Sequence, residues 1–474
     1  MEMKMKKQRG QSLVVGLMFL PIIVLFIIYL YNVSQQNLHK TRLQNTADAA
    51  VLSSSQYLVR ELNFKAYTNR AMIANHVAVG QYVGVASWFN FLVETIDNIE
   101  DVARYIPYVG PVFSQAEAWV DNINEVAVQP GMEIAVRATD LVNNALSMSQ
   151  DIMAYASSAT MIESLNDVIK VNDNQASLDA IAAPTLANTL FNDWRGFQGD
   201  FNRQDNSGRY NDFYKVILNS RDPFMKNRSH EWPFPFTIDI ISFCFLGMSM
   251  NYWTKQAGGT DLVNNGRYDP ETWTSMDTLS WHKEWFKKSL FSSGCRRSEL
   301  EIGWGAAHAG EDKDTGQFRN RQYYGRSRMI NRDASNRARY NESEFNNAYG
   351  GIYDFYSIKK INKSNDAPPV TIVVSKSIND IQSSKSLNIG TINEATTKEI
   401  DINIEEHLQV PRNQQSSASK ARIYYYRAND LWKNSKFEYG NLYNPYWQNT
   451  LSDIDNNQRR DLLLLLASFN LAGA

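Results

Sequence analysis

The sequence has little proline and glycine and no excess of charge of either sign. Its 474 residues include 13 Pro and 24 Gly, too few for a Pro/Gly-rich low-complexity chain. Lys plus Arg number 48 and Asp plus Glu number 50, and the net charge of −2 argues against a general nucleic-acid binder. The hydrophobic fraction of 43% and the charged fraction of 21% exclude a disordered or polytopic membrane chain. At ~100–200 residues per domain, the length predicts roughly two to four structural units.

Charge is absent altogether between Arg9 and Lys40. Within this interval, Leu13–Val33 is long enough to cross a bilayer, because about 20 apolar residues at ~1.5 Å rise span a ~30 Å hydrocarbon core. The apolar region of a signal peptide has only ~7–15 residues, and no small-residue cleavage site follows Val33 at once. We therefore predict a transmembrane helix over 11–33, in preference to a removed signal peptide or a buried core helix. The residues assigned to the membrane anchor are Leu13, Val14, Leu17, Phe19, Leu20, Pro21, Ile22, Ile23, Leu25, Phe26, Ile27, Ile28 and Leu30.

The flanks of this segment predict its orientation. Residues 1–10 form a basic leader with Lys4, Lys6, Lys7 and Arg9, whereas the next basic residue, Lys40, lies farther from the apolar edge. Positive charge favours the cytoplasmic side, so we expect a single-pass protein with a cytoplasmic amino terminus and most of its mass extracytoplasmic. Mid-span proline predicts either a tolerated kink or a hinge.

Helical periodicity continues after the membrane segment, so residues 34–165 are predicted to form a helical stalk or antiparallel bundle. Its first stripe has a small-residue face, and two interpretations stay open: packing on its own domain or on neighbouring subunits. Gly80 and Gly84 predict another close helix contact, and Pro130-Gly131 predicts an interruption. The two stripes are Leu43, Ala47, Ala50, Ser54, Leu58 and Leu62, and then Leu141, Ala145, Met148, Ile152 and Tyr155. Met148, Met153 and Met161 are expected as core filler.

Composition changes after about residue 165, and 166–474 is predicted as an extracytoplasmic domain. Strand-like runs occur at 371–375, 399–404 and 421–427, which favours a mixed antiparallel sheet and an α+β fold class. Trp281 and Trp285 are expected either in the core or on a carbohydrate- or partner-binding platform.

Few residues of the sequence are candidates for catalysis or for binding a metal or cofactor. The sequence has no H-E-x-x-H, G-x-S-x-G, Walker A or G-x-G-x-x-G string, so no catalytic site, metal site, cofactor or small-molecule substrate is predicted. His282 near Glu284 is interpreted as a structural histidine. The acidic strings 205–209, 311–316 and 453–457 are interpreted as turns, since each lacks part of a cation-binding pattern.

Two pairs of residues carry conditional predictions. Cys244 and Cys295 would form a disulfide if exported, closing a loop of about 50 residues, whereas in the cytosol they would be free thiols. Arg326 and Arg328 belong to an arginine-rich stretch, which indicates a solvated face or, alternatively, a docking site for an acidic partner or an anionic surface.

The string Thr41-Arg42-Leu43-Gln44-Asn45-Thr46-Ala47-Asp48-Ala49-Ala50, following a basic leader and an apolar span, resembles TadE/TadG-like proteins of the tight-adherence (Flp) pilus system. The resemblance covers about residues 8–55, with its motif carried by Arg42, Leu43, Gln44, Asn45, Ala47, Asp48, Ala49 and Ala50. Asn441–Gln448 resembles a closing motif of the larger TadG-like members. Gly10-Gln11 falls where prepilin-type proteins are cut. Such proteins usually carry Glu five residues later, where this chain has Val15, which favours an anchored assembly factor over a bulk filament subunit.

The resemblance implies a non-enzymatic component of Flp/Tad pilus assembly in the bacterial inner membrane, acting as a minor pilin-like subunit, primer or scaffold. Its expected partners are the lipid bilayer and other pilus-assembly proteins or pilin-like subunits, with no nucleic acid. Two alternatives remain: a membrane-anchored surface adhesin, and an envelope enzyme with a site assembled from distant residues.

Overall fold

The structure is a computed structural model of the chain. It describes residues 11–105, 110–180, 183–231, 238–239, 250–264, 269–287, 294–310, 330–340, 342–359, 365–377, 380–381, 414–427 and 438–455. Long helices combine with largely antiparallel sheets, which confirms the predicted α+β class. The chain divides into two compact units. Unit 1 comprises 1–64, 153–199 and 358–474, and unit 2 comprises 65–152 and 200–357.

Helices occupy most of the first 172 residues. Helix α1 runs from Gln11 to Ala103 with Pro21 inside it, so this proline does not end the helix. Two segments follow the predicted break near residue 105, namely α2 (Gly110–Ile123) and α3 (Gln129–Asn172). The later helices are short: α4 (Ala183–Asn188), α5 (Trp194–Phe197), α6 (Arg209–Asn219), α7 (Pro223–Lys226) and α9 (Arg332–Tyr340).

The helix interruption predicted at Pro130-Gly131 is wrong in its position and in its type. Both residues lie inside α3, and the irregularity precedes them as a π-helical turn, η1 (Asn124–Val128), which joins α2 to α3. Pro130 is tolerated because it sits in the first turn of α3, where the geometry of the preceding π turn replaces the ordinary i→i−4 pattern. A second π turn, η2 (Thr189–Asp193), links α4 to α5.

Unit 1 contains a four-stranded antiparallel sheet in the order β1-β10-β11-β12. Its strands are β1 (Ala176–Leu178), β10 (Val370–Ser377), β11 (Gln414–Tyr425) and β12 (Trp447–Ser452). Strand β10 contains the run predicted at 371–375, and β11 contains most of the run predicted at 421–427. The run predicted at 399–404 lies outside the described residues.

Unit 2 contains a larger sheet in the order β3-β5-β6-β7-β8, with β4 also paired to β5. The strands are β3 (His230–Glu231), β4 (Ile238–Asp239), β5 (Met250–Val263), β6 (Thr272–Lys287), β7 (Gly294–Gly310) and β8 (Glu342–Asn346). All pairs are antiparallel except β7 with β8. Strands β2 (Gln198–Phe201) and β9 (Phe355–Ile358) form a separate two-stranded sheet.

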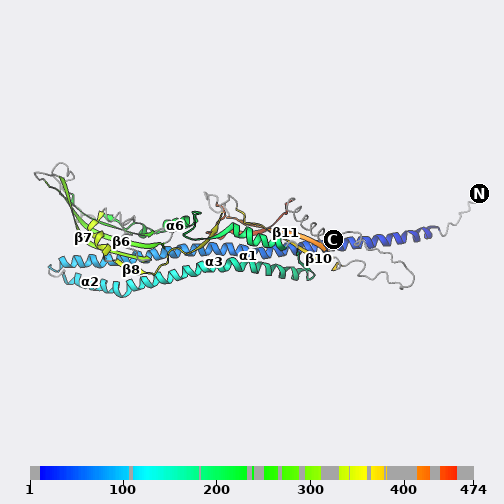
Figure 1. The fold of residues 1–474 in the computed structure, drawn as a ribbon, viewed down its shortest axis with the longest axis horizontal. Helices are drawn as coiled ribbons and strands as arrows, with labels where there is room; N and C mark the ends of the chain where they lie inside the picture. The colour runs from blue at the N-terminus through cyan, green and yellow to red at the C-terminus, as the bar shows by residue number, and fades with distance from the viewer. Residues whose placement is uncertain are drawn as a thin grey trace, which may run out of the picture. The chain divides into compact units, whose positions relative to one another are not determined.

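Helices cover both faces of the unit 2 sheet, which explains why the first nine residues of β6 are all buried. On one face Met276 and Trp304 pack with Ala334 and Ala338 of α9. On the other face α1 approaches the sheet closely, as Figure 1 shows for the helix running beneath β6 and β7. Alternate residues of a strand point to opposite faces, so both sets become core.

Within unit 2, helices α1 and α3 meet through polar side chains. Asn143 lies 3.3 Å from the His76 ring, and Gln150 donates hydrogen bonds to Thr68 and Asn69. Residues later in α3 contact residues earlier in α1, which confirms that the two helices run antiparallel. The stripe that the sequence places on α3 at helical spacing faces away from these contacts, since Leu141, Ala145, Met148, Ile152 and Tyr155 are all exposed. Among the expected core methionines, Met161 is buried but Met148 is exposed.

Candidate functional site: membrane anchor and helix–sheet contacts

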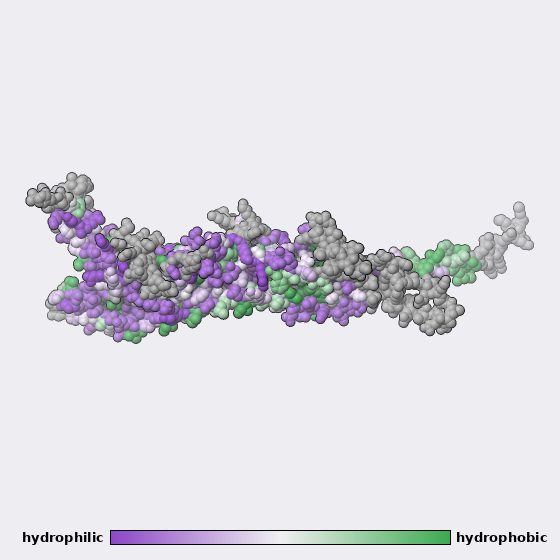
Figure 2. Space-filling view, in the orientation of Figure 1, coloured by the Kyte–Doolittle hydropathy of each residue, from purple (hydrophilic) through white to green (hydrophobic). Residues whose placement is uncertain are grey.

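The amino-terminal part of α1 is an exposed apolar surface. Its most apolar 18-residue window has a mean hydropathy of 3.0 and is 0% buried within the chain. Figure 2 shows this end of α1 as a continuous hydrophobic surface. Every predicted anchor residue from Leu13 to Leu30 is exposed except Ile28, which is half-buried. A helix of this length and composition fits a single-pass membrane anchor.

The predicted processing position lies at the edge of the described chain. Gly10 is outside the described residues, whereas Gln11 is the first residue of α1. Val15 is exposed on the apolar segment, where a carboxylate would be costly in lipid. Cleavage at Gly10-Gln11 stays a prediction.

The motif after the anchor binds the sheet of unit 1. The Gln44 side-chain amide donates to Asp48 Oδ1 at 2.9 Å and to the Ala418 carbonyl at 3.1 Å. The Ser419 hydroxyl donates to the same Asp48 oxygen at 2.5 Å. Ala418 and Ser419 both belong to β11. Gln44 and Asp48, one helical turn apart, therefore hold α1 on that strand.

The apolar part of the motif faces inward. Leu43, Ala47 and Ala50 are each 0–1% exposed, and Ala49 is half-buried. Small side chains let a helix approach a sheet closely, so these residues contribute packing area without a gap. Arg42 and Asn45, in contrast, are exposed. Of the two interpretations left open by the sequence, packing on its own domain accounts for the buried stripe, and only the exposed motif residues remain free to meet a partner.

The carboxy-terminal motif binds the same helix within unit 1. The Trp447 backbone N–H donates to Asn63 Oδ1 at 3.1 Å, and Asn63 Nδ2 donates to the Trp447 carbonyl at 3.0 Å. The Trp447 indole N–H donates to the Asn441 carbonyl at 2.8 Å, which closes the turn of the motif. Asn63 of α1 thus forms hydrogen bonds with both the N–H and the carbonyl of Trp447, the first residue of β12.

Glycines set the contact between α1 and the sheet of unit 2. A Cβ on Gly80 would lie 2.4 Å from Met225 and 2.7 Å from Trp273, and one on Gly84 would lie 2.8 Å from Thr260. On β7, a Cβ on Gly305 would lie 2.3 Å from the backbone nitrogen of Phe91. The predicted close contact at Gly80 and Gly84 is therefore present, but it is made with strands and α7 instead of with a long helix.

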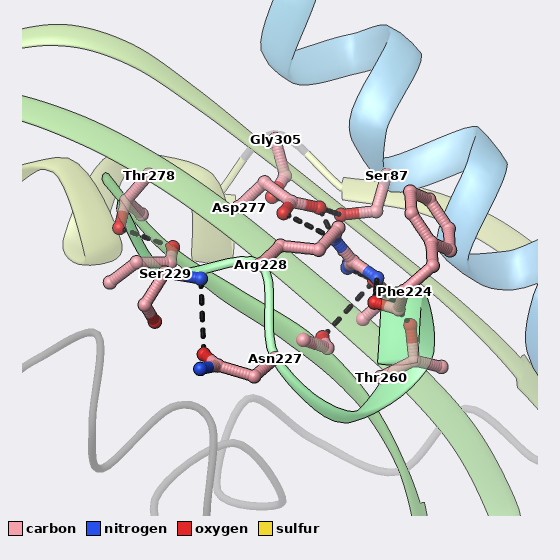
Figure 3. A network of polar contacts seen from close by, with 12 residues as sticks. Ser87, Phe224, Asn227, Arg228, Ser229, Thr260, Asp277, Thr278 and Gly305 are labelled. Atoms are coloured by element: carbon pink, nitrogen blue, oxygen red, sulfur yellow. Dashed lines mark hydrogen bonds and ion pairs between the residues drawn. The ribbon is translucent and has the colours of Figure 1, made fainter. Parts of the chain in front are cut away.

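A buried ion pair lies beneath this contact (Figure 3). Arg228 Nε donates to Asp277 Oδ1 at 2.6 Å and Nη2 donates to Oδ2 at 2.9 Å, with side-chain exposures of 5% and 0%. Ser87 of α1 donates to Asp277 Oδ2 at 2.8 Å. The remaining guanidinium hydrogens reach Thr260, Ser275 and the Phe224 carbonyl. A bidentate pair whose other polar atoms are hydrogen-bonded is the arrangement that buried charges require.

Other buried titratable groups serve the packing of unit 2. Complete burial lowers the pKa of His76 to about 3, so the ring is neutral at physiological pH. Its Nδ1 lies 2.9 Å from the Tyr349 hydroxyl. Asp200 of β2, in contrast, is exposed, and partial desolvation, reinforced by Asp354 and Asp151, raises its pKa to about 6. Neither shift is accompanied by a set of metal ligands, because the described residues contain no group of three or more His, Cys, Asp or Glu side chains that could hold a metal.

The other candidates from the sequence are turns or structural groups where the structure describes them. His282 Nε2 lies 2.9 Å from Asn331 Oδ1 in a buried contact, whereas Glu284 pairs with Arg297. The string beginning at Asp205 is a turn, in which the Ser207 N–H donates to Asp205 Oδ1 at 3.1 Å. Arg326 and Arg328 lie outside the described residues, as does Cys244, so docking and the Cys244–Cys295 disulfide stay predictions.

Sequence reasoning missed the polar residues that fasten α1 to its sheets. Asn63, Ser87, Arg228 and Asp277 belong to no motif that the sequence offers. A signal was present on α1 itself, since Glu61, Lys65, Asn69 and His76 follow helical spacing within a segment otherwise rich in apolar residues. All four side chains are fully buried.

The arrangement fits one class of protein, in which a single-pass membrane helix continues into contacts with sheets of its own chain. Residues 10–56 match the protein-family model described as "Putative Flp pilus-assembly TadE/G-like". This match spans the anchor and the motif on β11, and it confirms the resemblance to the TadE/TadG-like family over that segment. No curated protein and no solved structure matches the chain. The matched segment associates the protein with Flp/Tad pilus assembly.

Proposed function

We propose that the protein is a non-enzymatic, membrane-anchored component of a Flp/Tad-type pilus assembly system, acting as a minor pilin-like subunit, primer or scaffold. The observation that carries the proposal is the continuity of α1 from the exposed apolar anchor into the family motif. Because Gln44 and Asp48 fix that motif to β11, the sheet of unit 1 is attached to the membrane helix without a flexible linker.

The proposal places the protein in the bacterial inner membrane with its amino terminus in the cytoplasm and its bulk outside. The basic leader supports this orientation. A structural role is supported by the chemistry of the described residues, because buried groups such as His76 and Asp277 are engaged in packing and hydrogen bonds. Its partners would be the bilayer and other pilus-assembly proteins or pilin-like subunits.

Deletion of the gene, imaging of pili and pull-down of the tagged protein test the proposal. We expect loss or strong reduction of pili and recovery of pilus-machinery proteins. Normal pili together with a pull-down lacking such proteins would contradict it.

Complementation with motif variants separates internal from external roles of the motif. Asp48→Ala removes an acceptor used by both Gln44 and Ser419, so it should destabilise unit 1. Arg42→Ala and Asn45→Ala change exposed positions and should leave folding intact. Loss of pili in these two variants, with a normal thermal transition, would assign the exposed motif residues to a partner contact.

A membrane-anchored adhesin is the second candidate, and one observation favours it. Tyr252 and Trp281 stack at 5.0 Å on the unit 2 sheet, where Trp281 and Trp285 are both half-exposed rather than core. Lys283 Nζ lies 5.8 Å from the Tyr252 ring and 5.6 Å from the Trp285 ring. Partly exposed aromatic faces suit binding of sugar rings or a protein surface. A deletion strain with normal pili but lost surface binding would favour this function.

A further inference from the structure

The outer side of the helical segment α2–η1–α3 carries a row of exposed apolar side chains, which we name the outer stripe. Its members are between 47% and 74% exposed and all belong to unit 2. Hydrophobic patches follow the α2–α3 edge in Figure 2. The outer stripe consists of Val112, Trp119, Ile123, Val126, Ile134, Leu141, Met148 and Ile152.

The spacing of the outer stripe is that of a helix-pairing seam. Val112, Trp119 and Val126 are seven residues apart, and so are Ile134, Leu141 and Met148. A seven-residue repeat of apolar residues is the pattern by which one helix packs along another. Only the step from Val126 to Ile134 is longer, at eight residues.

The additional residue falls at η1, the π-helical turn Asn124–Val128. A π turn accommodates one extra residue within a helix, so it offsets the longer step and keeps both halves of the outer stripe on one side. The irregular turn and the irregular spacing therefore compensate each other, which a row of incidental surface residues would not require.

A second row completes the seam on α3. Four positions after Ile134, Leu141 and Met148 come Ala138, Ala145 and Ile152, the last of which already belongs to the outer stripe. The two rows together give the alternating four-three spacing of paired helices. Ala138 and Ala145 are both exposed. Small residues between large ones let a second helix come close, as in tightly packed helix pairs.

Within the described residues, the fold leaves the outer stripe exposed. On the opposite side of α3, Asn143 and Gln150 are fully buried against α1. In this part of α3, two polar side chains are buried beside Val136 while the apolar outer stripe is exposed, whereas apolar residues of a soluble protein normally face the core. Contiguous exposed apolar surface of this kind marks an interaction site.

Two charged residues near the α3 half of the outer stripe, Arg137 and Asp140, are engaged by other groups of the chain. Arg137 pairs with Glu133 at 2.8 Å and reaches the Asn346 carbonyl, and Asp140 accepts from Gly350 N–H and the Tyr353 hydroxyl. Between Ile134 and Ile152, only Asp151 adds a further charge, near one end. Along α2 and η1, Glu117, Asp121 and Glu125 add acidic side chains beside the outer stripe, so it is the α3 half that presents little like-charge repulsion to an identical surface.

We propose that the outer stripe pairs, parallel and in register, with the outer stripe of a second copy of this chain. The inference rests on the membrane anchoring in the proposed function, because anchored copies share one orientation and their α3 helices run in the same direction. Parallel pairing places Leu141 beside Leu141 and Met148 beside Met148, about a two-fold axis. Eight such side chains, at roughly 80–100 Å² each, approach the ~800 Å² per partner of a stable interface.

Cysteine cross-linking of the full chain in membranes tests the pairing. Leu141→Cys, treated with a short bis-maleimide, should give a species of doubled mass whose linked peptides join position 141 to position 141. The matched controls are the unsubstituted chain and Lys215→Cys, an exposed helical position on α6. Cross-linking no stronger than these controls would overturn the proposal, as would linkage of position 141 to a different protein only.

Two further variants keep the result interpretable. Co-expression of differently tagged Leu141→Cys and Met148→Cys chains that link only to each other would show antiparallel pairing and also overturn the proposal. Leu141→Glu should abolish cross-linking through Met148→Cys while leaving the thermal transition unchanged, because Leu141 is 68% exposed. Failure of pairing in a strain whose pili depend on the protein would refute this inference and leave the proposed function intact.

Discussion

Gly305→Ala tests whether α1 and the unit 2 sheet are packed backbone to backbone. Gly305 lies on β7, opposite Asp277 on β6. An added Cβ would lie 2.3 Å from the Phe91 backbone nitrogen and 2.4 Å from the Ser87 carbonyl oxygen. Neither atom can rotate away, since both belong to the α1 backbone. The helix or the strand must therefore move by roughly an ångström to restore ordinary contact distances.

That movement has consequences for the polar contacts around it. Ser87 donates to Asp277 at 2.8 Å, and Asn90 donates to the Ala306 carbonyl at 3.1 Å. Overpacking a core by one carbon costs about 1–3 kcal/mol, and loss of a buried hydrogen bond adds about 1 kcal/mol. We expect Gly305→Ala to lower the free energy of opening of β6 and β7 by about 2–4 kcal/mol.

Hydrogen exchange of the β6 and β7 amides measures that free energy locally, without assuming that both units unfold together. Gly294→Ala is the matched control, because Gly294 lies on the same strand and a Cβ there meets nothing within 4 Å. A Gly305→Ala variant whose exchange differs from that of Gly294→Ala by less than about 0.5 kcal/mol would refute the packing argument.

Three other predictions follow from buried or paired groups. Asp277→Asn leaves a buried guanidinium unpaired and should destabilise unit 2 by about 3–5 kcal/mol, whereas Glu284→Gln, whose partner Arg297 is 70% exposed, should cost less than about 1 kcal/mol in urea titration. The pKa of His76 is lowered to about 3 in the folded protein. Between pH 6.5 and 3, the ring is therefore protonated in the unfolded chain but neutral in the folded one. Stability should therefore fall by about 1.4 kcal/mol per pH unit between 6.5 and 3, and His76→Gln should remove that part of the slope. Thiol labelling of the exported protein should require reductant if Cys244 and Cys295 pair, and equal labelling with and without reductant would exclude the pairing.

The sequence was informative where one physical requirement dominates. A long charge-free apolar run fits a membrane-spanning helix, so a candidate anchor could be predicted from composition alone. A long stretch without proline after Pro21 favours one helix, and α1 indeed runs to Ala103. The β-branched run at 371–375 had few alternatives to a strand and lies in β10. In each case a local property decides the structure.

The sequence was less informative where several partners decide together. Asn63 and Trp447 are far apart in the chain, and their two hydrogen bonds depend on how β12 meets α1. The Arg228–Asp277 pair likewise forms only once a short segment and a long strand are brought to the same helix. Such contacts carry no local pattern, because the spacing that matters is set by the tertiary fold.

The α3 stripe shows why periodicity alone cannot tell a core from an interface. Leu141, Met148 and Ile152 repeat as core residues do, and the structure exposes them because Asn143 and Gln150 take the inner side. Gln150 is buried with Thr68 and Asn69 as partners on α1, and Asn143 Nδ2 contacts His76, although Asn143 Oδ1 has no partner among the described residues. Hydrogen bonds between two helices fix their register at little net gain in stability, whereas an apolar face gains only when it is covered. The division of α3 into these two faces therefore indicates that the inner one specifies the fold and the outer one is kept for association.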